Sequence, residues 1–348
     1  MPTDALSETF YDSQATWVLW LILIGSMGML AVGADRTVTA AAALARALHV
    51  SKVVIGATVV SLGTTLPETC VSVVAAFKGD GSLALGNAVG SIIADTGLIF
   101  GLCAAVTCIP KNRFVLNRHG WIQLGAGTLL AGLCFGLWAL SGDIHNVVLP
   151  RAAGLGLIAL LVGYLYLSVR WGRAHPEPVP TKAAPAPSRT SGFAAAKNLL
   201  VLAVGLGLIV GGSELLIGSA KVVCLRYGVP PAVLAVTLVA FGTSLPEFVT
   251  AIAALIKGHV DLSVGNIIGA DILNVLFVTG AAATAAPLNV EPPFFYLYLP
   301  VMMLVLLLFR GYITLGGNCF RRWQGVVLVA LYVGFVLLAL KLGVALSD

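Results

Sequence analysis

The chain has 348 residues, of which 59% are hydrophobic and only 10% are charged, and its mean hydropathy is +0.99. An ordinary soluble domain has about a quarter of its residues charged, so this composition excludes one and indicates an integral membrane protein. The formal net charge of +5 matters less than the positions of the basic residues, because these set the orientation of a membrane protein.

Ten apolar segments follow one another along the chain, each near the roughly 20 residues that a membrane-spanning helix needs. Helices are favoured over strands because these apolar runs are continuous, whereas a membrane strand alternates over about ten residues. The first fifteen residues contain three acids and no basic residue, so they lack the basic start of a secretory signal peptide, and we expect the first span to remain. The predicted spans are residues 15–34, 53–77, 83–109, 120–140, 147–169, 197–218, 231–256, 262–286, 292–309 and 324–346.

The loop between the fifth and sixth spans is rich in proline, alanine and basic residues, which is typical of a flexible linker. If this loop is cytoplasmic, 15 of the 20 Lys and Arg residues lie on the cytoplasmic side and 5 on the other. The sequence therefore predicts a protein of the cell (inner) membrane with both termini outside and the linker inside. The predicted domains are a first inverted repeat over residues 1–171, a cytoplasmic linker over 172–196 and a second inverted repeat over 197–348.

An internal repeat supports this division. When the sequence is shifted by 179 residues, segment 56–95 aligns with segment 235–274 without a gap, and 15 of the 40 positions are identical. The identities include Gly-Thr-x-Leu-Pro-Glu, ending at Glu68 and Glu247, and the Gly-Asn-x-x-Gly motif that follows in each half. Because each half has an odd number of spans, the two copies must enter the membrane from opposite sides. The predicted fold is an all-α integral membrane protein with ten transmembrane helices, arranged as two inverted five-helix repeats.

Four carboxylates fall inside these apolar repeats: Glu68, Asp95, Glu247 and Asp271. A charged residue at the centre of a membrane helix costs on the order of 3 kcal/mol unless it faces a partner, water or a cation. A Lys or Arg is the ordinary structural partner of a buried acid, but none lies within the apolar segments that carry these four. We therefore favour a cation from solution as the partner.

The residues around the glutamates indicate which kind of cation. Thr64 and Glu68 are four residues apart, as are Thr243 and Glu247, so each hydroxyl shares a helix face with a carboxylate. Each motif proline also weakens one helical hydrogen bond and releases a backbone carbonyl beside the acid. Carboxylate, hydroxyl and carbonyl oxygens are hard ligands, which suit calcium, sodium or magnesium and not zinc or copper.

Other polar residues carry a weaker signal. The six cysteines form no CxxC pair and the five histidines fall at predicted span ends or in loops, so we expect neither redox chemistry nor a histidine metal site. Asp35 and Glu214 are equivalent in the repeat and are expected near the ends of the first and sixth spans, where capping and a role in ion entry both remain open.

At these motifs the sequence resembles the cation/calcium exchanger superfamily, specifically its prokaryotic sodium/calcium antiporters. The family repeats read, in outline, GTSxPE followed by GNxxGSNxx[ND]; here GTTLPE is followed by GNAVGSIIAD, and GTSLPE by GNIIGADILN. The resemblance covers both halves and implies that Glu68 and Glu247 are the central calcium ligands. It further assigns the ion site to the positions of Thr64, Thr243, Thr65, Ser244, Ser61, Ala240, Ser91, Ala270, Asp95 and Asn274, with the backbone oxygens of Ser61 and Ala240 serving sodium.

Three positions depart from the family pattern. Ile92 replaces the usual Asn, Ala270 replaces a Ser and so removes one hydroxyl, and Asp271 stands where Asn is common. Asp271 is nevertheless kept among the candidate metal-site residues and, if protons replace sodium, is a candidate proton carrier together with Asp95. These departures bear on ion stoichiometry and sodium dependence more than on calcium selectivity at the two glutamates.

The resemblance implies a secondary antiporter that exchanges calcium for sodium by alternating access, with the first and sixth helices sliding across the other eight. A proton-coupled exchanger of the same fold is the alternative, because buried carboxylates can carry protons instead of sodium. A passive channel is disfavoured because so many ligands would hold a divalent ion too firmly for fast release, and an enzyme because the sequence has no HExxH or GxSxG motif. We expect no catalytic residue, no cofactor, and neither a nucleic acid nor a protein partner; the transported ions are calcium and sodium, or protons.

Overall fold

The computed structural model describes residues 10–48, 52–111, 113–174, 192–227, 244–315 and 317–345. These residues form helices, some with π-helical stretches (labelled η), and short strands. The first-half elements are α2 (Thr16–Leu48), α3 (Lys52–Ile55), η1 (Gly56–Val60), α4 (Ser61–Thr64), α5 (Leu66–Phe77), α6 (Gly81–Ile92), η2 (Ile93–Phe100), α7 (Gly101–Val106), β1 (Ile109–Pro110), α8 (Arg113–Ser141), β2 (Val148–Leu149) and α9 (Arg151–Ala174). The second-half elements are α10 (Gly192–Arg226), α13 (Leu245–Ile256), α14 (Val260–Leu273), η4 (Asn274–Thr279), α15 (Gly280–Ala285), β3 (Leu288–Asn289), η5 (Phe294–Tyr298), α16 (Leu299–Thr314), β4 (Cys319–Phe320) and α17 (Arg322–Ala345).

Several of these elements run on from one to the next and together form a helix long and apolar enough to cross a membrane, as α6, η2 and α7 do over Gly81–Val106 and α14, η4 and α15 over Val260–Ala285. Among the described residues, 8 helices meet this criterion, and the number rises to 9 when α3–η1–α4 and α5 are taken as one span bent by 46°. The seventh expected span, residues 231–256, is described only from residue 244 onward, and its helix α13 has 12 residues. The count of ten spans therefore remains a prediction.

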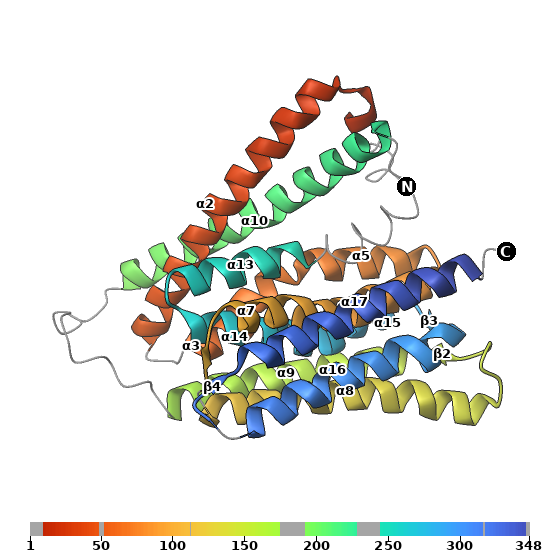
Figure 1. Cartoon of the computed structure of the whole chain (residues 1–348). Coiled ribbons are helices and arrows are strands. Elements are labelled where there is room, and N and C mark those ends of the chain that lie inside the picture. Colours follow the sequence, from red (N-terminus) through yellow and green to blue (C-terminus); the bar gives the residue numbers. More distant parts are fainter. Residues whose placement is uncertain are drawn as a thin grey trace.

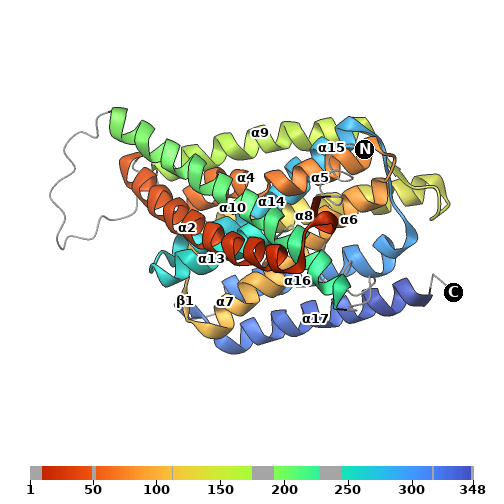
Figure 2. The ribbon, with the colours of Figure 1, turned by 90° about the horizontal axis from the view of Figure 1, so that it is seen from above.

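The helices α2 and α10 pack against each other and lie together outside the remaining helices (Figure 1). Seen from above, the pair crosses over the bundle (Figure 2). Both helices carry glycine where they meet: a Cβ atom on Gly33 would lie 2.9 Å from the carbonyl oxygen of Gly205, so a larger residue would push the helices apart. At one end, Arg226 of α10 donates to Thr16 Oγ1 at 2.9 Å and to two backbone carbonyls just before α2. We call α2 and α10 the outer pair.

The helices of the bundle recur at a constant interval in the two halves. The starts of α5 and α13, of α6 and α14, and of α7 and α15 are each 179 residues apart, at Leu66 and Leu245, Gly81 and Val260, and Gly101 and Gly280. Strands β1 and β3 begin at the same interval, at Ile109 and Leu288. The repeat found in the sequence is therefore also a repeat of backbone elements.

Two short ladders connect the halves. β1 pairs antiparallel with β4, and β2 pairs antiparallel with β3. Strand β4 lies at one end of the bundle, and β2 and β3 lie at the other (Figure 1). The equivalent strands β1 and β3 thus lie at opposite ends.

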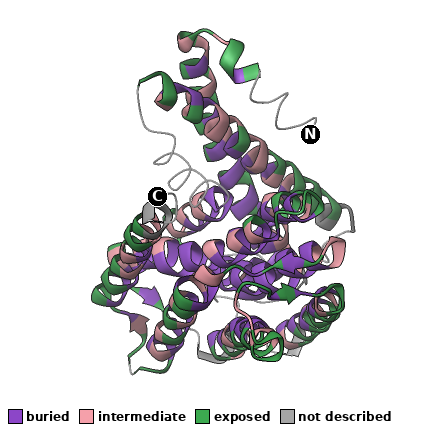
Figure 3. Ribbon diagram, turned by 90° about the vertical axis from the view of Figure 1, so that its right-hand side faces the viewer, coloured by how far each residue is buried: buried purple, intermediate pink, exposed green. Residues whose placement is uncertain are grey.

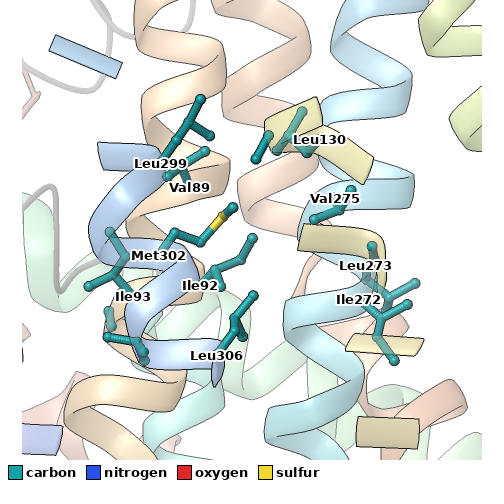
Figure 4. Close-up of a cluster of buried hydrophobic side chains, with 14 of the residues drawn as sticks. Val89, Ile92, Ile93, Leu130, Ile272, Leu273, Val275, Leu299, Met302 and Leu306 are labelled. Atoms are coloured by element: carbon teal, nitrogen blue, oxygen red, sulfur yellow. The ribbon is translucent and has the colours of Figure 1, made fainter. Parts of the chain in front are cut away.

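Buried residues concentrate in the bundle beneath the outer pair (Figure 3). Apolar side chains of α6 and α16 meet there, among them Ile92 and Met302 (Figure 4), and Ile272 of α14 belongs to the same buried cluster; all three are 0% exposed. Between membrane helices such contacts stabilise through close packing rather than through removal from water. This packing fixes the rotation of α6 and α14, and so decides where their polar residues lie.

The first and sixth helices are longer than expected. α2 continues past residue 34 to Leu48 through an alanine-rich segment of high helix propensity, and α10 continues past residue 218 to Arg226. Asp35 and Glu214 therefore lie inside helices, which excludes capping, one of the two roles that the sequence left open.

A disulfide joins Cys108, just before β1, to Cys319 of β4 across 211 residues. The sequence did not predict it, because these cysteines have no local spacing motif and become neighbours only in the folded chain. Under the predicted orientation this end of the bundle faces the cytoplasm, where thiols are usually kept reduced. A bridge that is fully formed in cells would argue for the reverse orientation, so thiol alkylation before and after reduction tests the predicted topology.

Candidate cation site

The two Leu-Pro-Glu segments begin their helices in the same way. Thr65 before α5 has φ −82° and ψ 0°, and Ser244 before α13 has φ −84° and ψ 8°. The proline that follows is tolerated in the first helical turn, where its missing N–H is not needed. Glu68 and Glu247 consequently lie in the first turns of α5 and α13, and the N-terminal end of a helix favours a negative charge.

The carboxylates at the centre of the bundle are buried and have no hydrogen-bond partner. Glu68, Glu247 and Asp95 are each 1% exposed, and none of their six carboxylate oxygens accepts a hydrogen bond. The hydroxyl of Ser91 and the side-chain oxygen of Asn274 are also buried and unpartnered. Since an unsatisfied buried polar group costs about 1–3 kcal/mol and a charge more, this arrangement is typical of oxygens that bind a cation.

The acids lie close enough to one another to repel. Glu68 experiences the charges of Glu247 and Asp95, and Asp95 experiences those of Glu247 and Asp271. These interactions connect the two halves of the chain. The structure thus brings the four predicted acids into one region of the bundle.

Two hydroxyls also reach from one half to the acids of the other. Thr64 of the first half lies beside Glu247, and Ser244 of the second half lies beside Asp95. Neither contact has hydrogen-bond geometry, so the carboxylates remain unpartnered. The candidate site is therefore built jointly by the two halves.

Carboxylates alone do not form a ready-made metal site. Within the described ranges, no three His, Cys, Asp or Glu side chains converge closely enough to hold a metal ion. A bound cation would need hydroxyl and carbonyl oxygens as well, which suits an ion such as calcium that takes about six to eight oxygens.

Asp95 and Asn274 lie in wide helical turns at equivalent positions. Asp95 is in the first turn of η2, and Asn274 is the first residue of η4. π-helical turns interrupt the regular hydrogen-bond ladder and are frequent at functional sites. Ser91, one turn earlier than Asp95, is 2% exposed.

Ser61 connects the first half to the second. Its Oγ lies 2.6 Å from the carbonyl oxygen of Gly56 and 3.0 Å from that of Asn266, within donating distance of either. Its own carbonyl oxygen accepts hydrogen bonds from the Thr65 N–H at 2.8 Å and from the Thr65 hydroxyl. The carbonyl that the resemblance assigns to sodium is thus engaged within the helix. In the second half, the predicted site positions Ala240 and Thr243 lie outside the described residues.

Asp271 has partners that the sequence did not reveal. Its Oδ2 accepts hydrogen bonds from Gln123 Nε2 at 2.5 Å and from the Thr96 hydroxyl, while its Oδ1 has no partner. Gln123 is 2% exposed and lies on α8. In the sequence, the only signal of this contact is a glutamine within an apolar predicted span. Asp271 therefore connects α14 to η2 and α8 beside the candidate site.

Asn87 supports Glu68 through the backbone. Its Nδ2 donates to the carbonyl oxygen of Glu68 at 3.1 Å and to Ser72 Oγ at 3.0 Å. Asn87 thus fixes α6 against α5. The asparagine of the Gly-Asn-x-x-Gly motif therefore has a structural role in the first half.

Known proteins match nearly the whole chain. The family model for sodium/calcium exchanger protein matches residues 18–170 and 197–341. The sodium/calcium exchanger MaX1 of Methanosarcina acetivorans is 29% identical over 344 residues, which cover 92% of this chain and 97% of MaX1. The inner membrane protein YrbG of Escherichia coli is 31% identical over 293 residues, covering 83% of this chain and 86% of YrbG. The structure of the sodium-calcium exchanger NCX_Mj aligns with a TM-score of 0.77 at 28% identity, covering 92% of this chain and 98% of that chain.

The fold and the site define an integral membrane protein with a buried, oxygen-lined centre. Since the family model covers most of the chain, the protein belongs to the sodium/calcium exchanger family.

Proposed function

We propose that this chain is a secondary antiporter that exchanges calcium for sodium at a site between Glu68 and Glu247. The observation that carries the proposal is the set of buried oxygens from both halves that have no hydrogen-bond partner. The sodium/calcium exchangers MaX1 and NCX_Mj match more than nine-tenths of the chain, which supports calcium and sodium as the ions.

The architecture we propose is ten transmembrane helices in two inverted repeats, divided at residues 172–196. The constant interval between equivalent helices and the position of the two ladders at opposite ends support it. In this arrangement both termini lie outside, the linker is cytoplasmic and the protein resides in the cell membrane; YrbG is named as an inner membrane protein.

The charges explain how one site could take either ion. Glu68 and Glu247 together neutralise one calcium ion, with the hydroxyls of Thr64 and Thr243 and backbone carbonyls completing its shell. Asp95 adds a third negative charge, which allows several sodium ions to occupy the same region in calcium's absence. Binding of the two ions is therefore competitive, as exchange through a single site requires.

Calcium-45 uptake into proteoliposomes tests this function. Vesicles loaded with sodium should take up calcium, and vesicles loaded with potassium or choline at the same pH should not. Glu68→Gln should abolish the sodium-driven uptake, whereas Glu291→Gln, a change at an exposed position, should leave it unchanged. Equal uptake from all vesicles regardless of the internal cation would contradict the proposal.

A proton-coupled exchanger is the second candidate, and Asp271 favours it. This residue adds a fourth buried carboxyl group beside the site, with one oxygen unpartnered. A set of acid-inside vesicles without sodium separates the two candidates. Uptake only in that set would assign protons as the coupling ion.

A further inference from the structure

One lysine connects the bundle to the outer pair. The Nζ of Lys257 lies 2.7 Å from Asp35 Oδ1, 2.7 Å from the Asp35 carbonyl oxygen and 2.5 Å from Thr39 Oγ1. An ammonium group has three donors, and these three acceptors all belong to α2. All three donors of the Lys257 ammonium group are therefore engaged by α2 of the outer pair.

The helix that carries Lys257 also carries Glu247. α13 has Glu247 in its first turn and Lys257 at its C-terminal cap. Leu245 at its start packs in one apolar cluster with Ala34 of α2 and Ile209 of α10. The outer pair thus contacts both ends of the helix that presents one of the two central glutamates.

The outer pair covers the two glutamate helices unequally. Leu245 at the start of α13 is 7% exposed, whereas the equivalent Leu66 at the start of α5 is 49% exposed. The outer pair converges on α13 at one end of the molecule and diverges from α5 toward the other (Figure 1). The structure is therefore asymmetric with respect to its two halves.

The repeat supplies the same residue types at the opposite end. Shifting Lys257 and Asp35 by 179 positions, in opposite directions, gives Lys78 and Glu214. Lys78 is the C-terminal cap of α5 just as Lys257 is of α13. In both cases the next residue is a glycine with positive φ, 82° at Gly79 and 72° at Gly258, a conformation that ends a helix.

We propose that Lys257 and Asp35 form a latch that closes the β1–β4 end of the site, and that Lys78 and Glu214 are its counterpart for the opposite end. The inference rests on the proposed alternating access. It identifies the residue pair that holds each end of the site closed. Movement of the outer pair from α13 toward α5 breaks the first contact and forms the second. Each latch stabilises one of the two states, so its loss shifts the population toward the other.

Spin-label distances test the latch without any need for transport. Labels are placed at Val32 on α2 and Ile256 on α13, 52% and 82% exposed, after Cys70 and Cys224 are replaced by serine. Lys257→Gln should increase the population with the longer distance about threefold, the ratio expected for a partly exposed ion pair. Asp35→Asn should have the same effect.

Two further variants separate the latch from a general loss of stability. The double exchange Asp35→Lys with Lys257→Asp should restore the distribution of the parent protein. Lys52→Gln, which removes an amine that lies 3.4 Å from His259 at the same end, should leave the distribution unchanged. Lys78→Gln should shift the population in the direction opposite to Lys257→Gln.

The outcomes distinguish this inference from the proposed function. An unchanged distance distribution in Lys257→Gln, in a protein that still exchanges calcium for sodium, would overturn the latch alone. Suppose that Lys257→Gln shifts the distance distribution and the double substitution restores it, but the protein does not exchange calcium for sodium. That result would support the latch and overturn the proposed function. A shift that the double exchange does not restore, or an equal shift in Lys52→Gln, would also overturn the latch.

Discussion

The two halves of this chain share one backbone plan but contribute differently to the site. Glu68 and Glu247 occupy equivalent positions in the first turns of α5 and α13. In the following helices, however, Asp95 of the first half corresponds to Asn274, and Ile92 corresponds to Asp271. A duplicated framework therefore does not impose a duplicated charge distribution, and the asymmetric residues are where coupling to a particular ion can be set.

The largest effect is expected at Glu68 and Glu247, which are the same residue type at equivalent positions of the two halves. Glu68→Gln and Glu247→Gln should each lower calcium exchange by at least about 30-fold, because losing one charge of a desolvated set costs about 2–5 kcal/mol. The initial rate of calcium-45 uptake into sodium-loaded vesicles measures this. If one variant kept the full rate, the two halves would not share the site.

The next effect concerns the asymmetric pair Asp95 and Asn274. Asp95→Asn should lower sodium-driven exchange about tenfold, because it removes the third negative charge that we propose for sodium binding. Adding Asn274→Asp should restore much of the rate, since the total charge of the site is then regained from the other half. Sodium-dependence curves for the single and double variants measure this. No recovery in the double variant would show that the position of the charge matters more than its presence.

A smaller effect on sodium-driven transport is expected for Asp271, because one of its carboxylate oxygens already accepts hydrogen bonds from Gln123 and Thr96. Asp271→Asn should keep sodium-driven exchange within about threefold, because an asparagine oxygen can still accept the hydrogen bonds from Gln123 and Thr96. Gln123→Leu removes one of these donors and should lower the free energy of unfolding by about 1–3 kcal/mol. Uptake assays and thermal unfolding in detergent measure the two effects. A tenfold loss of exchange in Asp271→Asn at unchanged stability would make Asp271 an ion ligand.

The smallest effect is expected where the second half lacks a hydroxyl. Ala270 is equivalent to Ser91 and is 0% exposed. Ala270→Ser should therefore change the sodium concentration for half-maximal exchange by no more than about threefold, because a hydroxyl adds one neutral ligand to a site dominated by charges. A larger change would show that this missing ligand determines the sodium dependence.

The sequence predicted the elements whose signals are local. Apolar segments of spanning length located the helices, and the repeated GTxLPE motif located the break before α5, the start of α13 and the buried glutamates of both helices. Family membership, which the resemblance suggested, is confirmed by the match over both halves. The assignment of individual residues to an ion stays a prediction.

What the sequence did not predict depends on distant contacts. The bridge between Cys108 and Cys319 and the contact of Gln123 with Asp271 each join segments more than a hundred residues apart. The full length of α2 was missed for a different reason. Hydropathy marks where a chain can enter a membrane, whereas an alanine-rich helix continues past that point on propensity alone.

Equilibrium binding of calcium-45 to the purified protein in detergent tests the central claim most directly. The account predicts that wild-type protein binds calcium, that added sodium displaces it competitively, and that Glu68→Gln and Glu247→Gln each remove the binding while Glu291→Gln keeps it. Calcium binding that both glutamine variants retain, or that sodium does not displace, would contradict a single site built by both halves.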